Sequence, residues 1–399
     1  MTVDIQPAAL LPTYNRAPVT FVAGEGCELI DDTGRRYLDF LAGIAVCALG
    51  HAHPAITDAV SEQARRLVHA SNLYHHEPAG TLARELVRRS GLSGAFFCNS
   101  GTEANEAAIK LARKRAFRNG EPKRRTIVAC TGSFHGRTMG ALAATANAAY
   151  REGFDPLPGG FSFTPFNDAG ALDSAIDDSV AAFIVEPVQG ESGVHVAHRA
   201  FLERARRLCD ERGALLLFDE VQCGMGRIGP TFAFEYFGVV PDVVTMAKAL
   251  ANGLPIGAVL AGGRADAGFA PGDHGSTFGG SPIPCAAALA HLRLRDELAL
   301  ENAVAARSQQ LRAGLEAMAL HNARLLGEVR GVGLLLAVDV QAPYLAADVV
   351  TRTRERGLLI ATAGGNAIRF APPLIVSSAD VERGLSMLND AVISLTQVA

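Results

Sequence analysis

The chain has 399 residues, 49% of them apolar, which is enough for a large core and about two domains. Lys and Arg number 37 against 41 Asp and Glu, so the formal charge is -4, and the absence of a long basic run argues against nucleic-acid and membrane partners. The first residues lack a basic stretch followed by an apolar one, and the longest apolar stretch, Leu41–Leu49, is far shorter than the roughly 20 residues of a membrane helix. We therefore expect a cytoplasmic globular protein with small-molecule partners.

Short apolar runs alternate with amphipathic helical stretches from about residue 80 onward, which is typical of a parallel sheet covered by helices. In the stretch 200–213 the apolar residues follow helical spacing, and Gly213 suits the left-handed position that ends a helix. The next run delivers Asp219 and Glu220 to the carboxyl end of a strand, where open α/β sheets bind ligands. The predicted strands of this sheet are 95–98, 126–130, 181–185, 214–218 and 243–247.

The end of the chain predicts a smaller α+β domain, completed by the N-terminal residues up to about 45. We place the larger domain at 46–280 and the smaller one at 1–45 plus 281–399. The predicted elements of the smaller domain are strands at 334–339, 358–362 and 367–370, a turn at 363–366, and helices at about 345–356 and 379–395.

Lys248 follows an apolar strand and precedes a loop that contains Gly and Pro, so its side chain can reach a pocket at the strand end. Lysine forms imines with carbonyl compounds, and partial desolvation lowers its pKa toward the free amine. For a lone lysine, a solvent-facing side chain is the more common outcome. Asp219 adds weight, because a carboxylate at the end of a buried strand is costly unless it meets a cation such as a protonated pyridine nitrogen. The alternative role of Asp219 is to cap a loop.

The segment around Ser100 predicts a phosphate site. Ser100 is placed as an N-cap, and Glu103 completes a capping box that opens a helix through about Phe117. Gly101 and Thr102 then offer backbone N–H groups at the positive end of the helix dipole. Many capping boxes bind nothing, and the Walker A and GxGxxG patterns that indicate a nucleotide are missing.

Phe134, His135 and Arg137 lie at the end of another predicted strand, where a stacking ring and a guanidinium fit a small anionic substrate. A packed Phe beside a solvated Arg explains the same residues equally well. No metal site is expected, because the histidine pairs lack an HExxH or Cys/His pattern. The seven cysteines form no CxxC pair, and we expect buried, reduced thiols at positions 27, 47, 98, 130, 209, 223 and 285.

Together these stretches resemble the class III aminotransferases, most closely the acetylornithine aminotransferase subgroup. The resemblance covers about residues 14–375 and implies the aspartate-aminotransferase-like fold of type I pyridoxal 5′-phosphate (PLP) enzymes, with a mostly parallel seven-stranded sheet in the large domain. The motifs, in chain order, are YNRAPV, DDTGRRYLDF, GHAHP, SNLY, CNSGTEANEAAIK, FHGRT, EPVQGESG, FDEVQCGMGR, AKALANGLPIGA, HGSTFGGSP and IRFAPPL. The chain departs from the pattern at Ser281, where Asn is usual.

The resemblance implies a role for each residue of a cofactor site. Lys248 is expected to hold PLP as a Schiff base and to shuttle a proton, and Asp219 is expected to pair with the pyridine nitrogen. The expected neighbours of the cofactor are Val221 and Phe134 on the two ring faces, Gln222 near the phenolic oxygen, Gly101 and Thr102 on the phosphate, and Thr277 on the phosphate from the second subunit. Such a shared site implies a homodimer.

The resemblance also implies how substrates bind. Arg137 is expected to hold the carboxylate remote from the reacting amine, and Arg369 the α-carboxylate of glutamate. Glu191 is expected to pair with Arg369 when no carboxylate is present there. Tyr14 and Ser276 are expected at the substrate site.

The implied reaction is ping-pong transfer of the terminal amino group of N2-acetylornithine to 2-oxoglutarate, giving N-acetylglutamate 5-semialdehyde and glutamate in arginine biosynthesis. Succinylornithine, ornithine and 4-aminobutyrate aminotransferases share the same residues and remain alternatives. A nicotinamide-dependent oxidoreductase would need a Gly-rich fingerprint, and a non-catalytic binding protein would be expected to lack Lys248 or Asp219.

Overall fold

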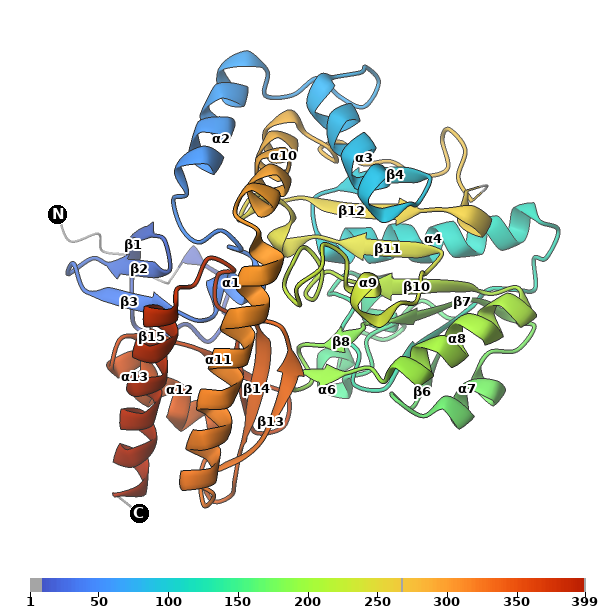
Figure 1. Cartoon of the computed structure of the whole chain (residues 1–399). Coiled ribbons are helices and arrows are strands. Elements are labelled where there is room, and N and C mark those ends of the chain that lie inside the picture. Colours follow the sequence, from blue (N-terminus) through green and yellow to red (C-terminus); the bar gives the residue numbers. More distant parts are fainter. Residues whose placement is uncertain (1–8, 267, 398–399) are drawn as a thin grey trace.

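The computed structural model describes residues 9–266 and 268–397. Its largest element is a seven-stranded sheet in the order β4-β12-β11-β10-β7-β5-β6 (Figure 1). All neighbouring strands in this sheet are parallel except where β12 pairs with β11 and β4. The predicted α/β class with a mostly parallel seven-stranded sheet is thus confirmed. The strands are β4 (Gly94–Cys98), β5 (Thr126–Cys130), β6 (Phe161–Thr164), β7 (Val180–Val185), β10 (Leu215–Asp219), β11 (Val243–Met246) and β12 (Gly257–Ala261).

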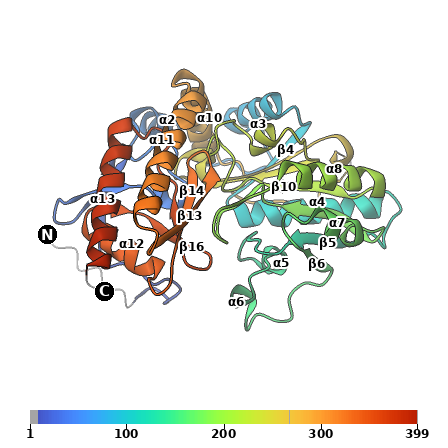
Figure 2. The same cartoon turned by 60° about the horizontal axis from the view of Figure 1, so that its bottom comes forward.

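The continuous apolar runs arise because both faces of the sheet are covered. Alternate residues of each strand enter two separate cores. On β10, Leu215 and Leu217 pack with α4 (Gly101–Arg118) on one face, whereas Leu216 and Phe218 share the other core with α8 (Arg199–Arg212). A strand buried on both faces cannot show the polar alternation of a half-exposed strand. Figure 2 shows α4 and α8 as separate layers on the sheet.

The helix predicted at 200–213 forms as α8, and its apolar stripe is buried. Gly213 takes the left-handed conformation with φ of 73°, as predicted for a residue that ends a helix. β6 and β12 were not predicted, although both belong to the central sheet. The short connecting elements here are α5 (Met139–Ala143), α6 (Ala148–Arg151), α7 (Ala169–Ala175), β8 (Val188–Gln189), β9 (His195–Val196), α9 (Ala233–Phe237) and the 3-10 turns η2 (Lys248–Ala251) and η3 (Gly263–Ala265).

Two four-stranded sheets with three helices form a second part of the chain. One has the order β1-β2-β3-β15 and the other β13-β14-β17-β16, so β15, from the C-terminal part, joins the N-terminal strands. Their strands are β1 (Phe21–Glu25), β2 (Glu28–Asp31), β3 (Arg36–Asp39), β13 (Leu326–Val332), β14 (Leu335–Val340), β15 (Leu358–Leu359), β16 (Ala361–Ala363) and β17 (Ala367–Phe370). The helices are α11 (Leu300–His321), α12 (Ala346–Glu355) and α13 (Ser378–Thr396).

The prediction of a single strand at 358–362 is wrong. The run divides between two sheets, because Leu358 pairs with Leu38 of β3 while Ala361 pairs with Arg369 of β17. Apolar composition alone cannot reveal that division. The turn at 363–366 does join β16 to β17, whereas β13 and β1 to β3 were not predicted.

One sheet thus combines N-terminal strands β1 to β3 with β15 from the C-terminal part, and the division into two domains with limits at residues 45 and 281 stays a prediction. Residues 1–8 lie outside the described part. The remaining helices, α2 (Pro54–Arg66), α3 (Glu77–Ser90) and α10 (Pro282–Glu297), pack together at the top of Figure 1, and α1 is the short segment Ala42–Ala45. Within residues 9–266 and 268–397, no helix combines the length and apolar character that a membrane crossing requires.

Candidate active site

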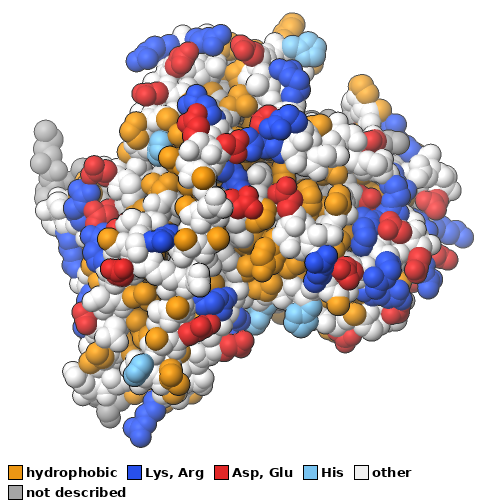
Figure 3. Space-filling view, in the orientation of Figure 1, with side chains coloured by type: hydrophobic (Ala, Val, Ile, Leu, Met, Phe, Trp, Pro, Cys, Tyr) orange, Lys and Arg blue, Asp and Glu red, His pale blue; other side chains and the backbone are white. Residues whose placement is uncertain are grey.

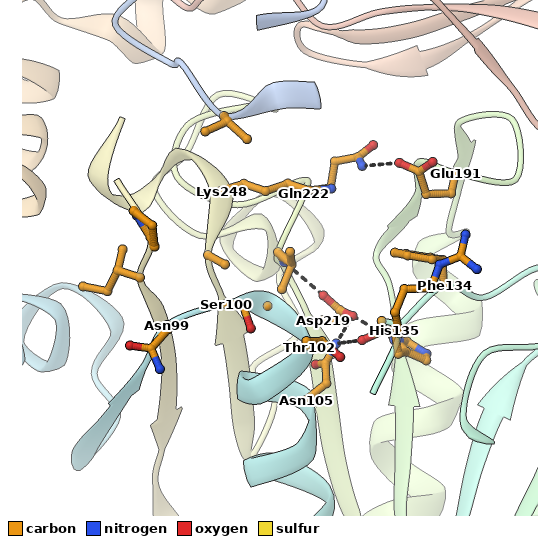
Figure 4. Close-up of a pocket in the computed structure, with 18 of the residues that line it drawn as sticks. Asn99, Ser100, Thr102, Asn105, Phe134, His135, Glu191, Asp219, Gln222 and Lys248 are labelled. Atoms are coloured by element: carbon orange, nitrogen blue, oxygen red, sulfur yellow. Dashed lines mark hydrogen bonds and ion pairs between the residues drawn. The ribbon is translucent and has the colours of Figure 1, made fainter. Parts of the chain in front are cut away.

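A cavity of about 380 Å³ lies at the carboxyl ends of the parallel strands, next to the start of α4. This is where open α/β sheets bind ligands, because loops from several strands meet there. Residues far apart in the sequence therefore share one wall. The lining residues include Asn99, Ser100, Gly101, Thr102, Asn105, Phe134, His135, Arg137, Glu186, Glu191, Asp219, Val221, Gln222 and Lys248 (Figure 4).

Lys248 begins η2, which Ala247 separates from β11, and has the left-handed φ of 39°, which is unusual for a residue other than glycine. Its amine has no hydrogen-bond or ion-pair partner in the part of the chain that the structure describes. Burial lowers the pKa of Lys248, while the nearby Glu191 carboxylate opposes that shift. The geometry thus presents a desolvated amine to the cavity, which favours the free-base form that attacks carbonyl carbon.

Asp219, at the end of β10, is 4% exposed at its side chain. One carboxylate oxygen accepts from His135 Nδ1 at 2.8 Å and Asn105 Nδ2 at 2.7 Å, and the other accepts from the Val221 amide at 3.0 Å. The Asn105 side-chain oxygen accepts in turn from the Thr245 hydroxyl at 2.7 Å. Figure 4 shows His135 and Asn105 bonded to Asp219. A buried carboxylate with this many donors holds one position, which an electrostatic partner of a ring nitrogen requires.

The start of α4 forms an anion cradle. The Ser100 hydroxyl accepts from the Glu103 amide at 3.3 Å, and the Glu103 carboxylate accepts from the Asn99 amide at 3.1 Å. The predicted cap is therefore correct, but its second bond reaches one residue further back than a capping box does. No acceptor contacts the amides of Gly101 and Thr102 within the described residues. Two free amides at the N-terminus of an 18-residue helix suit a phosphate.

Val221 and Phe134 are both in the wall of the cavity. A Cβ added to Gly101 would lie 2.7 Å from Val221 Cγ1, so only glycine leaves room for the valine there. Phe134 is braced by an edge-on contact with Tyr150, with ring centroids 5.8 Å apart. An aliphatic branch and an aromatic ring are surfaces on which a flat heterocycle packs.

Arg369 is not among the residues that line the cavity, but it forms a charged cluster with two that are, Glu191 and Gln222. Arg369 Nη1 lies 2.7 Å from Glu191 Oε1 and donates to Gln222 at 3.2 Å, and Gln222 donates to the same Glu191 oxygen at 2.9 Å. Arg369 Nε is buried without a partner. Burial opposes ionisation of Glu191, but Arg369 and Lys248 outweigh it and lower the pKa of this carboxyl. The guanidinium therefore keeps a free donor with which it could bind an incoming carboxylate.

Arg137 lines the cavity with an exposed side chain. Its guanidinium lies 3.8 Å from the ring centre of Tyr150 and 5.6 Å from that of Phe134. Two aromatic neighbours hold the arginine without neutralising its charge, so it remains available to an anion at the mouth.

Besides Arg369, three residues predicted at the site do not line the cavity of this chain. Tyr14 is 74% exposed in the N-terminal segment. The Ser276 hydroxyl oxygen accepts from Asn99 Nδ2 at 3.2 Å and from the Gly279 amide at 3.0 Å. Thr277 is exposed in the loop before α10, whose N-cap is Ser281. For Thr277 this position agrees with a role toward a second subunit, and the roles of all three stay predictions.

Sequence reasoning assigned no role to several buried polar residues of the site. His135 and Asn105 support Asp219, and Glu186 accepts from the Phe134 amide at 3.0 Å. Burial and then Asp219 raise the pKa of Glu186 well above its usual value. Glu220 turns away and accepts from two amides at the start of α9, and burial raises its pKa to about 8. The position of Glu186 directly after β7 was the one signal that could have found it.

The described residues contain no group of three or more His, Cys, Asp and Glu side chains arranged to hold a metal ion. The groups available for chemistry are the amine of Lys248, the free amides at the start of α4, the space between Val221 and Phe134, and the buried carboxylate of Asp219.

The family model for aminotransferase class-III matches residues 12–392. The acetylornithine aminotransferase of Thermosynechococcus vestitus is 48% identical, with 98% of this chain and 97% of the relative covered. That of Methanocaldococcus jannaschii is 45% identical, with 97% of each chain covered.

Solved structures with the same fold also match over nearly the whole chain. The ornithine aminotransferase of Toxoplasma gondii superposes with a TM-score of 0.95 at 32% identity, covering 98% of this chain and 94% of that one. The N-acetylornithine aminotransferase of Stenotrophomonas maltophilia has a TM-score of 0.85 at 38% identity, covering 97% and 98%. A further structure of the Toxoplasma enzyme reveals PLP at partial occupancy in its active site.

Proposed function

Because the chain belongs to the class-III aminotransferase family, we propose that it transfers the terminal amino group of N2-acetylornithine to 2-oxoglutarate. The products are N-acetylglutamate 5-semialdehyde and glutamate, as in arginine biosynthesis. The observation that carries the proposal is the buried Arg369, which is paired with a partly exposed Glu191 and still has an unpartnered Nε. Such a group can take up and release a carboxylate, as alternating substrates require.

The enzyme is PLP-dependent, and the residues of the cavity fit the cofactor. The free amides of Gly101 and Thr102 suit its phosphate, the space between Val221 and Phe134 suits its ring, and the carboxylate of Asp219 suits its ring nitrogen. The unpartnered amine of Lys248 suits its aldehyde carbon. When bound, PLP supplies an electron sink for the pair of electrons left when the substrate carbon loses its proton.

Lys248 has two tasks in this proposal. Its amine would hold the cofactor and, once free, would carry a proton from one side of the reacting bond to the other. Burial keeps that amine close to its neutral form, so that it can accept the proton. The Asp219 carboxylate would keep one position against the ring nitrogen, because His135 and Asn105 hold it in place.

The two arginines explain how one cavity accepts two unlike substrates. Acetylornithine places its reacting amine at the end of the chain and carries its carboxylate at the other end, near Arg137. It therefore offers nothing to Arg369, and Glu191 neutralises that buried guanidinium. 2-Oxoglutarate carries a carboxylate beside its reacting carbon. Glu191 then moves toward solvent and Arg369 binds the substrate instead.

We further propose a cytoplasmic homodimer with shared active sites. Thr277 lies next to an exposed apolar surface on residues 67–74 and Phe278, where Leu73 and Phe278 are 86% and 62% exposed. Asn72 joins the two segments through its bonds to the Ser276 and Gly279 carbonyl oxygens, each 2.9 Å long. Several exposed apolar side chains on neighbouring segments favour association, and a second copy would bring Thr277 toward the neighbouring cavity. Sedimentation of the Leu73→Asp variant tests this, and an unchanged dimer would contradict the assigned surface.

The substrate proposal is tested by comparing kcat/KM for acetylornithine, succinylornithine, ornithine and 4-aminobutyrate, each with 2-oxoglutarate as acceptor. We expect acetylornithine to be turned over fastest, with succinylornithine next. Faster turnover of 4-aminobutyrate or ornithine would overturn the choice of substrate while leaving the transaminase class intact. Loss of the cofactor's visible absorption in its lysine-linked form in Lys248→Ala checks the anchor separately.

A further inference from the structure

The loop of residues 190–193 carries Glu191 between β8 and β9, and the sheet β13-β14-β17-β16 holds its backbone. Three carbonyl oxygens of the loop accept hydrogen bonds from residues of that sheet or of its last turn. The bonds are Arg369 Nη1 to Gly190 at 3.1 Å, the Gly364 amide to Glu191 at 2.9 Å, and Arg330 Nε to Gly193 at 2.5 Å. The backbone of the loop is therefore fixed, although the Glu191 side chain is 25% exposed.

Arg330 makes its bond from β13 and is not among the residues that line the cavity. Its side chain is 14% exposed, and Nη1 lies 2.7 Å from Asp339 Oδ2 on the neighbouring strand β14. This ion pair orients the guanidinium, so that Nε faces the Gly193 oxygen. A Cβ added to Gly193, which has a φ of 123°, would lie 2.9 Å from Arg330 Nη2. Arg330 thus packs closely against the loop that carries Glu191.

The turn between β16 and β17 contacts the same loop from another direction. A Cβ added to Gly364 would collide with the backbone of Ser192, so only glycine allows this close approach. Within the loop's own hairpin, the Ser192 hydroxyl donates to Gln189 Oε1 at 3.3 Å. The position of the backbone is therefore set by contacts that do not involve the Glu191 carboxylate.

We propose that Arg330 is a positioning residue for the exchange at Arg369, because it holds the loop where the Glu191 carboxylate meets the Arg369 guanidinium. The inference rests on the proposed function, in which a substrate carboxylate displaces Glu191 from Arg369. The paired state places the Glu191 carboxylate within hydrogen-bond distance of a buried cation, so it requires one backbone position. A Glu191 side chain that faces solvent has no such requirement. Loss of the Arg330 bond therefore weakens the paired state selectively.

The expected effect on dicarboxylate binding is opposite in sign to that of general damage to the fold. Glu191 competes with an incoming carboxylate for Arg369, so a weaker pair leaves the guanidinium available for more of the time. One hydrogen bond from a charged donor is strong enough to change such an equilibrium by about tenfold. Removal of Arg330 should therefore tighten the binding of a dicarboxylate. A residue that only stabilised the fold would weaken this binding or leave it unchanged.

The test measures the dissociation constant of glutarate, a dicarboxylate without a reacting carbonyl group, by isothermal titration calorimetry of the cofactor-loaded protein. We expect Arg330→Gln to bind glutarate about three- to tenfold more tightly than the unchanged protein. Arg312→Gln is the matched control. Arg312 also donates to carbonyl oxygens of β13, those of Val329 and Gly331, and its removal should leave the dissociation constant unchanged.

A second comparison asks whether Arg330 acts through Glu191. In Glu191→Ala no side-chain carboxylate competes for Arg369, so the further substitution Arg330→Gln should not change glutarate binding. If Arg330→Gln does not fold, Gly364→Ala takes its place, because the added methyl group displaces the same loop at Ser192. This variant should also bind glutarate more tightly, and only when Glu191 is present.

Unchanged or weaker glutarate binding by Arg330→Gln overturns the proposal, and so does an equal gain in the Glu191→Ala background. Arg369→Ala separates this result from the proposed function. If Arg369→Ala binds glutarate as tightly as the unchanged protein does, the assigned carboxylate site fails, and the proposed function fails with it. If Arg369→Ala loses glutarate binding while Arg330→Gln binds it normally, only the positioning role fails. No amine substrate takes part, so the result is independent of which amine the enzyme prefers.

Discussion

The Asp219 end and the Arg369 end of the cavity hold their charges in different ways. Asp219 and His135 are 4% and 0% exposed, and the carboxylate is held by donors from three separate segments. Arg369 is 3% exposed, but its partner Glu191 is 25% exposed and belongs to a loop. A single guanidinium nitrogen, Nη1, donates all the hydrogen bonds of Arg369 to Gly190, Glu191 and Gln222. The first end is fixed and the second is exchangeable. This difference suggests that one end keeps the chemistry constant while the other adapts to each substrate.

Lys248 lies between the two ends, and its removal should have the largest effect. We expect Lys248→Ala to lower turnover by at least about 10⁴-fold, since both the anchor and the proton carrier are lost. The free energy of unfolding should not fall, because a buried amine without a partner contributes no stabilising bond. Single-turnover kinetics and chemical denaturation measure the two quantities.

The exposed Lys123 provides the control for this substitution, and Lys123→Ala should retain full activity. Substantial turnover by Lys248→Ala would contradict this role, because it would show that another group moves the proton. Among the residues that line the cavity, no lysine other than Lys248 could do so.

Asp219→Ala tests whether the fixed end is also a structural element. The change leaves His135 Nδ1 and Asn105 Nδ2 buried without their acceptor, so we expect a loss of about 3 kcal/mol in the free energy of unfolding. Activity should fall as well, because the ring nitrogen loses its counter-charge. Asp210→Ala is the matched control. Asp210 is 57% exposed in ion pairs with Arg206 and Arg264, and its removal should cost less than about 1 kcal/mol. Equal losses in both variants would mean that the Asp219 end is not fixed by these bonds.

Arg369→Ala tests the exchangeable end. We expect kcat/KM for 2-oxoglutarate to fall by about 10²-fold, in line with the loss of one buried, hydrogen-bonded charge. The half-reaction with acetylornithine should change less, because that substrate presents no carboxylate to Arg369. Separate measurement of the two half-reactions gives both values.

The complementary variant is Glu191→Gln, which leaves Arg369 without its charge partner while the amine substrate is bound. Here the acetylornithine half-reaction should suffer more than the 2-oxoglutarate half-reaction. Equal effects of either variant on both half-reactions would contradict an exchange between Glu191 and the substrate.

Part of the Asp219 end could be predicted from the sequence, because its residues lie where predicted strands end. An apolar run buried on both faces is easy to recognise, and the residues that follow it, Asp219 and Lys248, must lie at one edge of the sheet. The Ser100 cap was equally local. His135 and Asn105 were not assigned because their role depends on a contact with Asp219, 84 and 114 residues away. A local sequence pattern cannot indicate a contact between residues so far apart in the chain.

The exchangeable end was predicted through family resemblance and not through spacing. Arg369 follows Ile368 in a short strand, and nothing in that run indicates that its guanidinium meets Glu191, 178 residues earlier. β6 and β12 were not predicted, although both belong to the seven-stranded sheet. The run at 358–362 was wrongly assigned to one strand, because its division between two sheets depends on tertiary contacts. The predicted role of Thr277 involves a second subunit, whose surface a single chain cannot supply.

Glu186→Gln should give the smallest change and sharpens the description of the fixed end. Burial, and then Asp219, raise the pKa of Glu186, so the folded protein retains a proton that the unfolded chain loses above its ordinary pKa of 4.5. The carboxyl therefore contributes stability that is fully present below pH 4.5 and declines as the pH rises. Glutamine is neutral, has the same shape and can still accept from the Phe134 amide. At pH 5 the variant should match the unchanged protein within about 1 kcal/mol, and its stability should decline less toward pH 8. Denaturant titrations at several pH values measure this, and a variant that loses stability more steeply would mean that Glu186 is ionised beside Asp219.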